Sequence, residues 1–219
     1  ILYGMAADHL VSADVALSDG SLAVFAEISL KEAERRANMG ESIEADLYRL
    51  ALEIRSSHSD VIRQNWPRVW RRVSGYNLNY LLPWSPSVPP EWAYGNYPPI
   101  GENSLNMAML MAGSEGTLGV MREVTLGLVP TRKHTSLGVL VFDSIAEACD
   151  AAPELLSRGP SAVELIPGEL LQLALSVPAY ARQLTFVKGS PAAMLVVEFS
   201  GDEKDVVVEK AHALGTDVL

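Results

Sequence analysis

Apolar and polar residues alternate over residues 10–28, on both sides of the polar run Ser18-Asp19-Gly20. Successive side chains of a strand point to opposite faces of a sheet, so this alternation is typical of strands with one buried face. Asp-Gly is a frequent turn sequence between such strands because glycine accepts a positive φ. The pattern therefore predicts a β-hairpin.

Two helices are predicted directly after the hairpin. Ser29 stands three residues before Glu32, as in a capping box, where the serine oxygen accepts a backbone N–H and the glutamate reaches back. This helix is expected to run to about Met39, with Gly40 as its C-terminal cap. A second helix is expected over 41–57, where apolar residues recur at three- and four-residue steps. Those residues are Ile43, Leu47, Leu50, Ala51 and Ile54.

The stretch 82–103 predicts a long surface loop, because its six prolines exclude a helix or a central strand. It also holds two tryptophans and two tyrosines, and that many aromatic rings rarely stay fully solvated. Three interpretations stay open: the lining of a substrate pocket, simple packing, or contact with another part of the protein.

A second patterned region follows Pro130 and the charged run Arg132-Lys133-His134, so a domain break is predicted at 130–136. Strands and helices are expected to alternate there as a two-layer, ferredoxin-like arrangement with helices on one face of a sheet. The expected strands are 137–142, 161–166 and 193–197, with an extension of the last strand to 199 left open. The expected helices are 144–156, capped by Ser144, 167–175, and 202–214, ending at Gly215.

The run 113–120 carries three glycines, one at every third position, before an expected half-buried strand from Met121 to Val129. Such glycines allow a positive φ and let a phosphate or a flat ring approach the peptide N–H groups. The spacing is neither that of the dinucleotide fingerprint nor that of a phosphate loop. On spacing alone, a tight structural turn and a ligand cradle are both open, with the turn slightly favoured.

Charge and composition exclude several classes of function. The formal net charge is −10, which argues against nucleic acid and anionic membrane surfaces as partners. No apolar run reaches the roughly eighteen residues of a membrane span. The single cysteine, Cys149, cannot form an internal disulfide, which favours a reducing, cytoplasmic compartment, and its helix position favours a buried side chain.

Side chains for metal or nucleophilic catalysis do not cluster in the sequence. The four histidines are scattered, so no metal site is predicted, and Ser114 lacks the G-x-S-x-G elbow of hydrolases. Between residues 60 and 72 the local charge is positive, because Arg63, Arg68, Arg71 and Arg72 meet only Asp60. Arginines can clamp a carboxylate or phosphate, although on a surface they more often face water or pair with acids.

Three stretches resemble, in order, the FAD-linked oxidases of the vanillyl-alcohol oxidase/PCMH type. Residues 3–20 are similar to Y-G-x-x-x-D-x-V and V-x-L-x-D-G, with Leu10 in place of the final valine of the first motif. Residues 71–78 resemble the G-Y-[DN]-L segment, and 113–126 the glycine-rich run. The long spacing between these two stretches is similar to that of large bacterial proteins that fuse an FAD oxidase to an iron–sulfur module.

This resemblance implies an α+β fold and an oxidoreductase function. Residues 1–130 would be the C-terminal part of an FAD-binding domain, with 82–103 as an insertion, and 131–219 the start of a ferredoxin-like substrate cap domain. The implied activity is the FAD-dependent oxidation of the CH–OH group of a 2-hydroxy acid such as glycolate, D-lactate or D-2-hydroxyglutarate. Electrons would pass to an iron–sulfur module in the same or a partner chain.

The resemblance also implies which residues lie near FAD. The glycine-rich run would contact its pyrophosphate, ribose or adenine, and the G-Y-N segment would lie near the flavin. Arg71 and Arg72, directly before that segment, are candidates for substrate binding. The family's metal-binding and basic histidines fall beyond Leu219, so catalytic residues are not assigned. The expected cofactor contacts are Gly113, Ser114, Glu115, Gly116, Thr117, Val120, Tyr76 and Asn77.

The chain is expected to be a fragment, because the family's P-R-G-G-G loop and N-S-G run are missing from it. Half of a pyrophosphate site lacks part of its N–H donors, so the fragment alone is expected to bind FAD weakly or not at all. The alternative hypothesis, from another class, is a non-catalytic subunit or docking module that kept the fold and lost the flavin.

Overall fold

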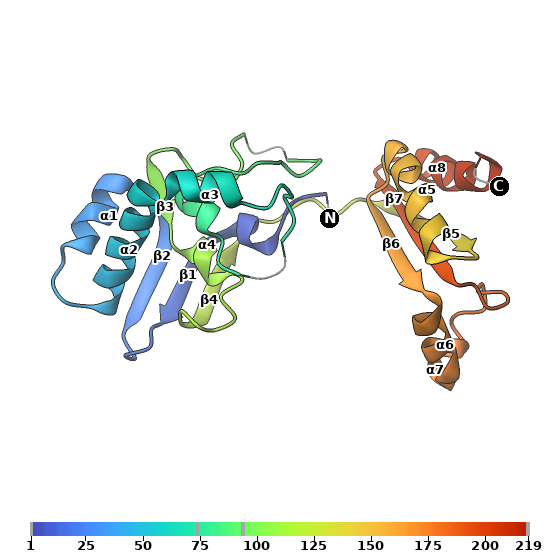
Figure 1. The fold of residues 1–219 in the computed structure, drawn as a ribbon, viewed down its shortest axis with the longest axis horizontal. Helices are drawn as coiled ribbons and strands as arrows, with labels where there is room; N and C mark the ends of the chain where they lie inside the picture. The colour runs from blue at the N-terminus through green and yellow to red at the C-terminus, as the bar shows by residue number, and fades with distance from the viewer. Residues whose placement is uncertain (1, 73–74, 93–94, 218–219) are drawn as a thin grey trace. The chain divides into compact units, whose positions relative to one another are not determined.

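A computed structural model describes residues 2–72, 75–92 and 95–217. The chain has an α+β fold, as predicted, and divides into two compact units, Ile1–Val129 and Pro130–Leu219. Each unit has its own sheet and its own buried core (Figure 1). Within the described ranges, no helix is long and apolar enough to cross a membrane.

The sheet of the first unit has four antiparallel strands. β1 (Leu10–Ala16) and β2 (Leu22–Ser29) form the predicted hairpin, which confirms that interpretation. β3 (Ser104–Asn106) pairs with β2, and β4 (Val120–Leu126) pairs with β1, so the strand order is β3-β2-β1-β4. Residues distant in sequence therefore complete both sides of the hairpin.

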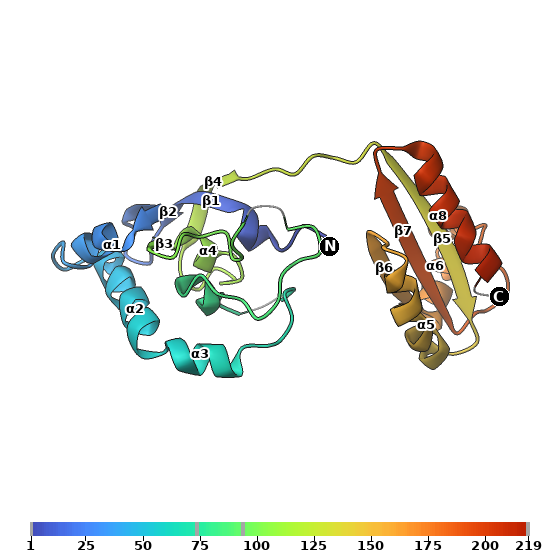
Figure 2. The same ribbon diagram turned by 90° about the horizontal axis from the view of Figure 1, so that it is seen from above.

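Helices α1 (Leu30–Ala37) and α2 (Ile43–Ser57) lie against this hairpin (Figures 1 and 2). Ser29 caps α1 by accepting a hydrogen bond from the Glu32 N–H. The Glu32 carboxylate pairs with two arginines of the same helix rather than reaching back as a capping box requires. Its pKa falls to about 2, chiefly because of the hydrogen bonds from these arginines.

The buried face of α2 differs from the predicted one at two positions. Tyr48 is fully buried, with its ring edge toward Phe25 at a centroid distance of 6.1 Å. Leu50 is 52% exposed, so its place in the predicted apolar stripe was wrong. Tyr48 was not part of the predicted stripe, because only aliphatic residues were used to define that stripe.

Short elements, not predicted, surround the Pro-rich loop. The first are the turns η1 (Ala6–His9) and η2 (Leu78–Leu81), together with α3 (Ser59–Asn65). Helix α4 (Ala108–Met111) follows β3, and all four of its residues are buried. No helix or strand occurs in the described part of 82–103, as predicted, yet Tyr97 and Ile100 are buried, so this loop packs against the unit.

Strand β4 departs from the expected half-buried strand over Met121 to Val129. It ends at Leu126, and all seven of its side chains are exposed. Val124 and Leu126 are 42% and 48% exposed although they lie opposite buried residues of β1. β4 is an edge strand, and the side chains of the core cluster come from β1, β2, β3 and the helices.

The second unit is a three-stranded antiparallel sheet with the order β5-β7-β6. The order β5-α5-β6-β7-α8 follows the ferredoxin-like pattern, with two helices inserted between β6 and β7. The elements are β5 (His134–Phe142), α5 (Ile145–Ser157), β6 (Ala162–Pro167), α6 (Gly168–Ser176), α7 (Pro178–Ala181), β7 (Ala193–Gly201) and α8 (Lys204–Asp217).

Helices α5 and α8 cover one face of this sheet (Figure 2). Leu214 of α8 comes so close to β5 that a Cβ on Gly138 would lie 2.4 Å from its Cδ1, which explains the glycine in the strand. Two predictions were wrong here: α8 continues past Gly215, and Cys149 on α5 is exposed. The cap by Ser144, which accepts from the Glu147 N–H, is confirmed.

Candidate functional site

The glycine-rich run forms a tight turn between the buried helix α4 and strand β4. Gly113, Glu115 and Gly116 have φ values of +89°, +52° and +78°. Two hydrogen bonds close the turn, from the Ser114 N–H to the Met111 carbonyl and from the Thr117 N–H to the Ser114 carbonyl. A left-handed backbone at these positions favours glycine, which accounts for two of the three glycines.

The three glycines serve different purposes. A Cβ on Gly113 would lie 2.7 Å from the carbonyl oxygen of Gly75, and one on Gly119 would lie 2.7 Å from Val15 Cγ1 on β1. These two glycines therefore let other parts of the protein come close. Gly116 has no atom within 4 Å of its ideal Cβ position, so its face of the turn opens to solvent.

Tyr76 and Asn77 lie against this turn. The order of the motifs along the sequence does not by itself predict this contact. The Tyr76 hydroxyl lies 2.7 Å from Thr117 Oγ1. The buried Asn77 amide donates to the carbonyl of Ala112 at 2.9 Å, one residue before the turn begins. The structure thus brings together Tyr76, Asn77, Gly113 and Thr117, which the sequence places about forty positions apart.

Arg72 supports the same segment from the other side. Its Nη2 lies 3.3 Å from Asn77 Oδ1 and 3.2 Å from Asn79 Oδ1, and its guanidinium lies 4.9 Å from the centre of the Trp66 ring. A hydrogen bond from a charged donor contributes about 1.5–3 kcal/mol, against about 0.5–1.5 kcal/mol for a neutral one such as Tyr76–Thr117. The two Arg72 contacts have a charged donor but are longer than the 2.7 Å contact between Tyr76 and Thr117.

A small cavity of about 170 Å³ lies where these segments meet. Arg72, Gly75, Asn77 and Gly113 line it together with Ala112 and residues 5–7. Arg71 is exposed, and residues 73–74, which the sequence motif includes, lie outside the described ranges. The arginine that the fold draws into the candidate site is thus Arg72.

The predicted contact residues differ in how accessible they are. Glu115, Gly116 and Thr117 are exposed, and Val120 is 66% exposed at the start of β4. Ser114 is buried, and its hydroxyl donates to the Met111 carbonyl at 2.9 Å. Ser114 therefore shapes the turn, while Glu115 to Thr117 present their backbone and side chains outward.

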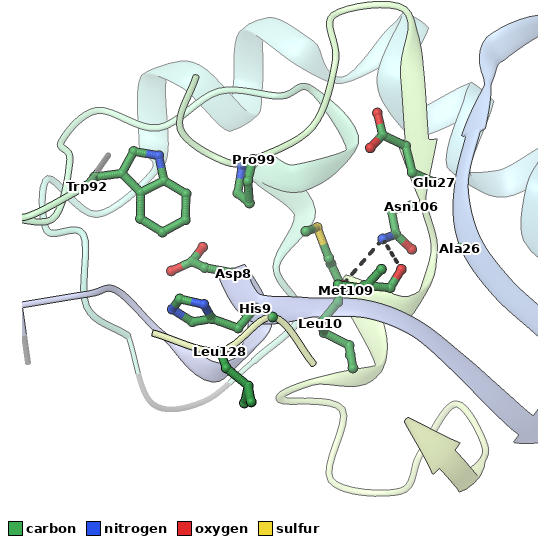
Figure 3. A pocket seen from close by; sticks show the side chains of 12 residues that line it. Asp8, His9, Leu10, Ala26, Glu27, Trp92, Pro99, Asn106, Met109 and Leu128 are labelled. Carbon is green, nitrogen blue, oxygen red and sulfur yellow. Dashed lines mark hydrogen bonds between the residues drawn. The ribbon is translucent and has the colours of Figure 1, made fainter. Parts of the chain in front are cut away.

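A larger pocket of about 460 Å³, which the sequence does not reveal, opens beside η1 and the Pro-rich loop (Figure 3). Asp8 is at its wall and only 5% exposed. Its carboxylate accepts hydrogen bonds from the hydroxyls of Tyr80 and Tyr97 and from the Met5 N–H. The two tyrosines come from segments 72 and 89 residues away, so only the folded chain assembles this cluster.

Burial controls the protonation of this cluster. It raises the pKa of the Asp8 carboxyl above its ordinary value, against the opposing effect of the hydrogen bond from Tyr80. Burial raises the pKa of both tyrosine hydroxyls as well, so they act as donors. The rings of His9 and Trp92 lie 6.0 Å apart at the same pocket (Figure 3).

Two other polar side chains of this pocket are hydrogen-bonded within the protein. Glu27 accepts from the Gly101 N–H, and Asn106 donates to the Val11 carbonyl. The walls are otherwise formed by apolar side chains such as Met109 and Leu128. Among the described residues that line this pocket there is no arginine or lysine to hold an anionic ligand. Across the described ranges, no three metal-ligating side chains come together.

Comparison with known proteins connects the second unit to a family of flavoenzymes. Residues 131–217 match the family described as "FAD linked oxidases, C-terminal domain". D-2-hydroxyglutarate dehydrogenase of Pseudomonas putida is 24% identical over 172 residues, which are 77% of this chain and 15% of that protein. The Escherichia coli protein of the same name is 21% identical over 98% of this chain and 20% of its own length.

A relative of higher identity covers less of the chain. The mitochondrial D-lactate dehydrogenase [cytochrome] of Arabidopsis thaliana is 34% identical over 45% of this chain and 16% of its own length. Among solved structures, alkyldihydroxyacetonephosphate synthase is similar over 52% of this chain and 25% of its own, with 19% identity and a TM-score of 0.36. The chain spans no more than 20% of the length of these curated relatives.

The buried carboxyl predicts a pH-dependent stability. Because the pKa of folded Asp8 is raised, its contribution is fully present below the unfolded pKa and is lost as the pH rises through the folded pKa. Wild type should therefore lose stability relative to Asp8→Asn over the pH range that begins at the ordinary aspartate pKa of about 4 and extends upward. Thermal denaturation of both proteins across that range measures this difference.

Asp19→Asn provides a control in which the stability difference from wild type should change with pH in the opposite direction. The hydrogen bond from the Ser21 hydroxyl lowers the pKa of the Asp19 carboxyl, so its contribution is present at higher pH and is lost as the pH falls. A wild-type minus Asp8→Asn difference that is constant, or that grows with pH, would contradict the assignment of a raised pKa.

Proposed function

We propose that this chain, whose residues 131–217 match the C-terminal domain of FAD-linked oxidases, belongs to that family and is part of an FAD-dependent dehydrogenase of 2-hydroxy acids. Relatives named D-2-hydroxyglutarate dehydrogenase and D-lactate dehydrogenase support this substrate class. Because the chain spans only 15% to 20% of two such relatives, we propose that the complete enzyme is longer. Residues 1–130 would belong to its FAD-binding domain and 131–219 to its substrate cap.

One observation carries the proposal for FAD: hydrogen bonds join Tyr76 and Asn77 to Thr117 and Ala112 at the two ends of the 113–117 turn, and Gly116 lies open on that turn. A positive φ at Gly116 together with empty space beyond its Cα suits a cofactor that lies against the backbone. The residues present therefore fit the adenosine side of FAD. FAD, when bound, supplies the acceptor for the hydride of the alcohol carbon.

Charge decides which part of the cofactor this turn would meet. Glu115 is exposed directly before Gly116, and a carboxylate disfavours contact with an anionic pyrophosphate. A carboxylate is instead a good acceptor for ribose hydroxyls, as in dinucleotide-binding folds. We therefore propose that Glu115, Gly116 and Thr117 border the ribose and adenine, with Val120 offering apolar contact. Gly113 and Ser114 would hold the turn, and Tyr76 and Asn77 would extend the surface toward the flavin.

Arginines are the candidates for the substrate's negative charge. Arg71 is exposed and Arg72 lines the small cavity next to Asn77, so either could hold a carboxylate. The described lining of the larger pocket at Asp8 includes no arginine or lysine for this task. We further propose an iron–sulfur module as the electron acceptor and a cytoplasmic location. The lone exposed cysteine agrees with a reducing compartment.

A visible absorbance spectrum tests the proposed function most simply. The purified longer protein should show a flavin band and be bleached when glycolate, D-lactate or D-2-hydroxyglutarate is added without oxygen. The isolated residues 1–219 should show weak flavin binding or none. A longer protein that folds, lacks the band and takes up no added FAD would favour the alternative, a docking module without flavin.

Gly116→Val tests the turn itself. The new side chain should occupy the space beyond Gly116 and abolish flavin binding, while the strained backbone costs about 1–3 kcal/mol of stability. Gly40→Val is the matched control, because Gly40 has a φ of +83° and equally empty surroundings but lies after α1. Flavin content and circular dichroism are measured on both variants.

The two variants should lose similar stability, and only Gly116→Val should lose flavin. Equal flavin content in both variants would remove the turn from the cofactor site. Loss of flavin in both would mean that the effect follows general destabilisation.

A further inference from the structure

Arg72 stands at the centre of a chain of contacts that ends at the glycine turn. Its guanidinium lies over the Trp66 ring at 4.9 Å, and its Nη2 donates to Asn77 Oδ1. Asn77 in turn donates from Nδ2 to the Ala112 carbonyl, next to Gly113. Three side chains thus connect the end of α3 with the start of the turn.

The partners of Arg72 are unusual for an arginine in an acidic chain. The chain carries 27 acidic and 17 basic residues, yet the partners described for this guanidinium are neutral. They are the amide oxygens of Asn77 and Asn79, the Val69 carbonyl and the Trp66 ring. An arginine that bonds two buried amides while stacked on a ring has a fixed orientation, because its planar donors are used at several points.

We infer that Arg72 is a positioning residue, which fixes the Asn77 side chain and through it the backbone at 112–113, so that the 113–117 turn keeps the shape in which Gly116 is open. The expected effect of this positioning is tighter FAD binding, and that effect rests on the proposed function. The fixing of the turn by Arg72 and Asn77 does not depend on FAD. It depends only on the contacts from Trp66 to Ala112.

The geometry distinguishes this role from simple charge attraction. Lysine keeps a positive charge at position 72, but its ammonium is a point charge without the flat, forked donor pattern of arginine. Positioning therefore predicts that Arg72→Lys fails, whereas attraction of an anion predicts that it succeeds. Arg63 offers a matched control, because it lies 5.3 Å from the Trp84 ring and forms the same kind of stack.

Two measurements on the longer protein test the inference. Amide hydrogen exchange of the flavin-free protein, read on peptides that cover 109–118, should be about tenfold faster in Arg72→Lys than in wild type. The dissociation constant for FAD should rise by about the same factor. Arg63→Lys should leave both quantities unchanged. Circular dichroism checks that each variant is folded.

Asn77→Ser breaks the same chain at its other end and leaves Arg72 intact. It should accelerate amide hydrogen exchange at 109–118 as Arg72→Lys does. A double variant with both substitutions should exchange little faster than either single variant, because both substitutions interrupt the same chain of contacts. This variant also keeps the test decisive if Arg72→Lys does not fold.

Two results would overturn the inference: unchanged exchange at 109–118 in Arg72→Lys or Asn77→Ser, or full retention of FAD affinity in Arg72→Lys. If wild type itself takes up no FAD, the proposed function fails, and the exchange measurement still decides the positioning role on its own.

Discussion

The close approach of Gly113 to Gly75 is the contact on which the candidate site depends. The ideal Cβ position of Gly113 lies 2.7 Å from the Gly75 carbonyl, a distance that no other residue type tolerates without a shift of the backbone. Gly113 also has a φ of +89°, which disfavours any side chain. Both the close approach and the positive φ require glycine at position 113. This glycine allows the segment around Asn77 to contact the turn after α4.

The rest of the first unit places these two segments opposite each other. The hairpin and its two helices hold the main core, and α4 lies within that core with all of its residues buried. The turn therefore begins from a fixed point. Asn77 reaches that point through its bond to Ala112, and Arg72 and Tyr76 add contacts on either side. A rigid base with an open tip is what a backbone-mediated ligand contact needs.

Sequence periodicity predicts the elements whose pattern is local. The hairpin, α1, α2 and the helices and strands of the second unit other than α7 follow from the spacing of apolar residues and from caps such as Ser29 and Ser144. Elements of three or four residues, such as β3 and α4, are too short for any period to appear. The exposure of β4 follows from its place at the edge of the sheet, which pairing decides rather than its own residues.

In the candidate site, likewise, the sequence indicates some residues, whereas others become apparent only in the structure. Glycines at 113 and 116 stand out in the sequence, and a resemblance suggests a role for Tyr76 and Asn77. The partners that give these residues their geometry are remote: Asn77 and Ala112 are 35 positions apart, and Asp8 lies 72 positions from Tyr80. Asp8 belongs to a motif of the resemblance, but its tyrosine partners do not, so the buried Asp8 cluster forms only when distant segments meet. The Trp66–Arg72 stack joins residues only six positions apart, and the spacing of apolar residues does not indicate it.

A crystal structure of the longer protein with bound FAD would show whether the 113–117 turn contacts the cofactor. We expect the adenosine part of FAD to lie against the backbone of Gly116 and Thr117, within hydrogen-bond distance of Glu115, while Gly113 stays packed against Gly75. FAD bound elsewhere, with residues 113–117 facing solvent in the complex, would contradict the assignment of this turn as a cofactor site.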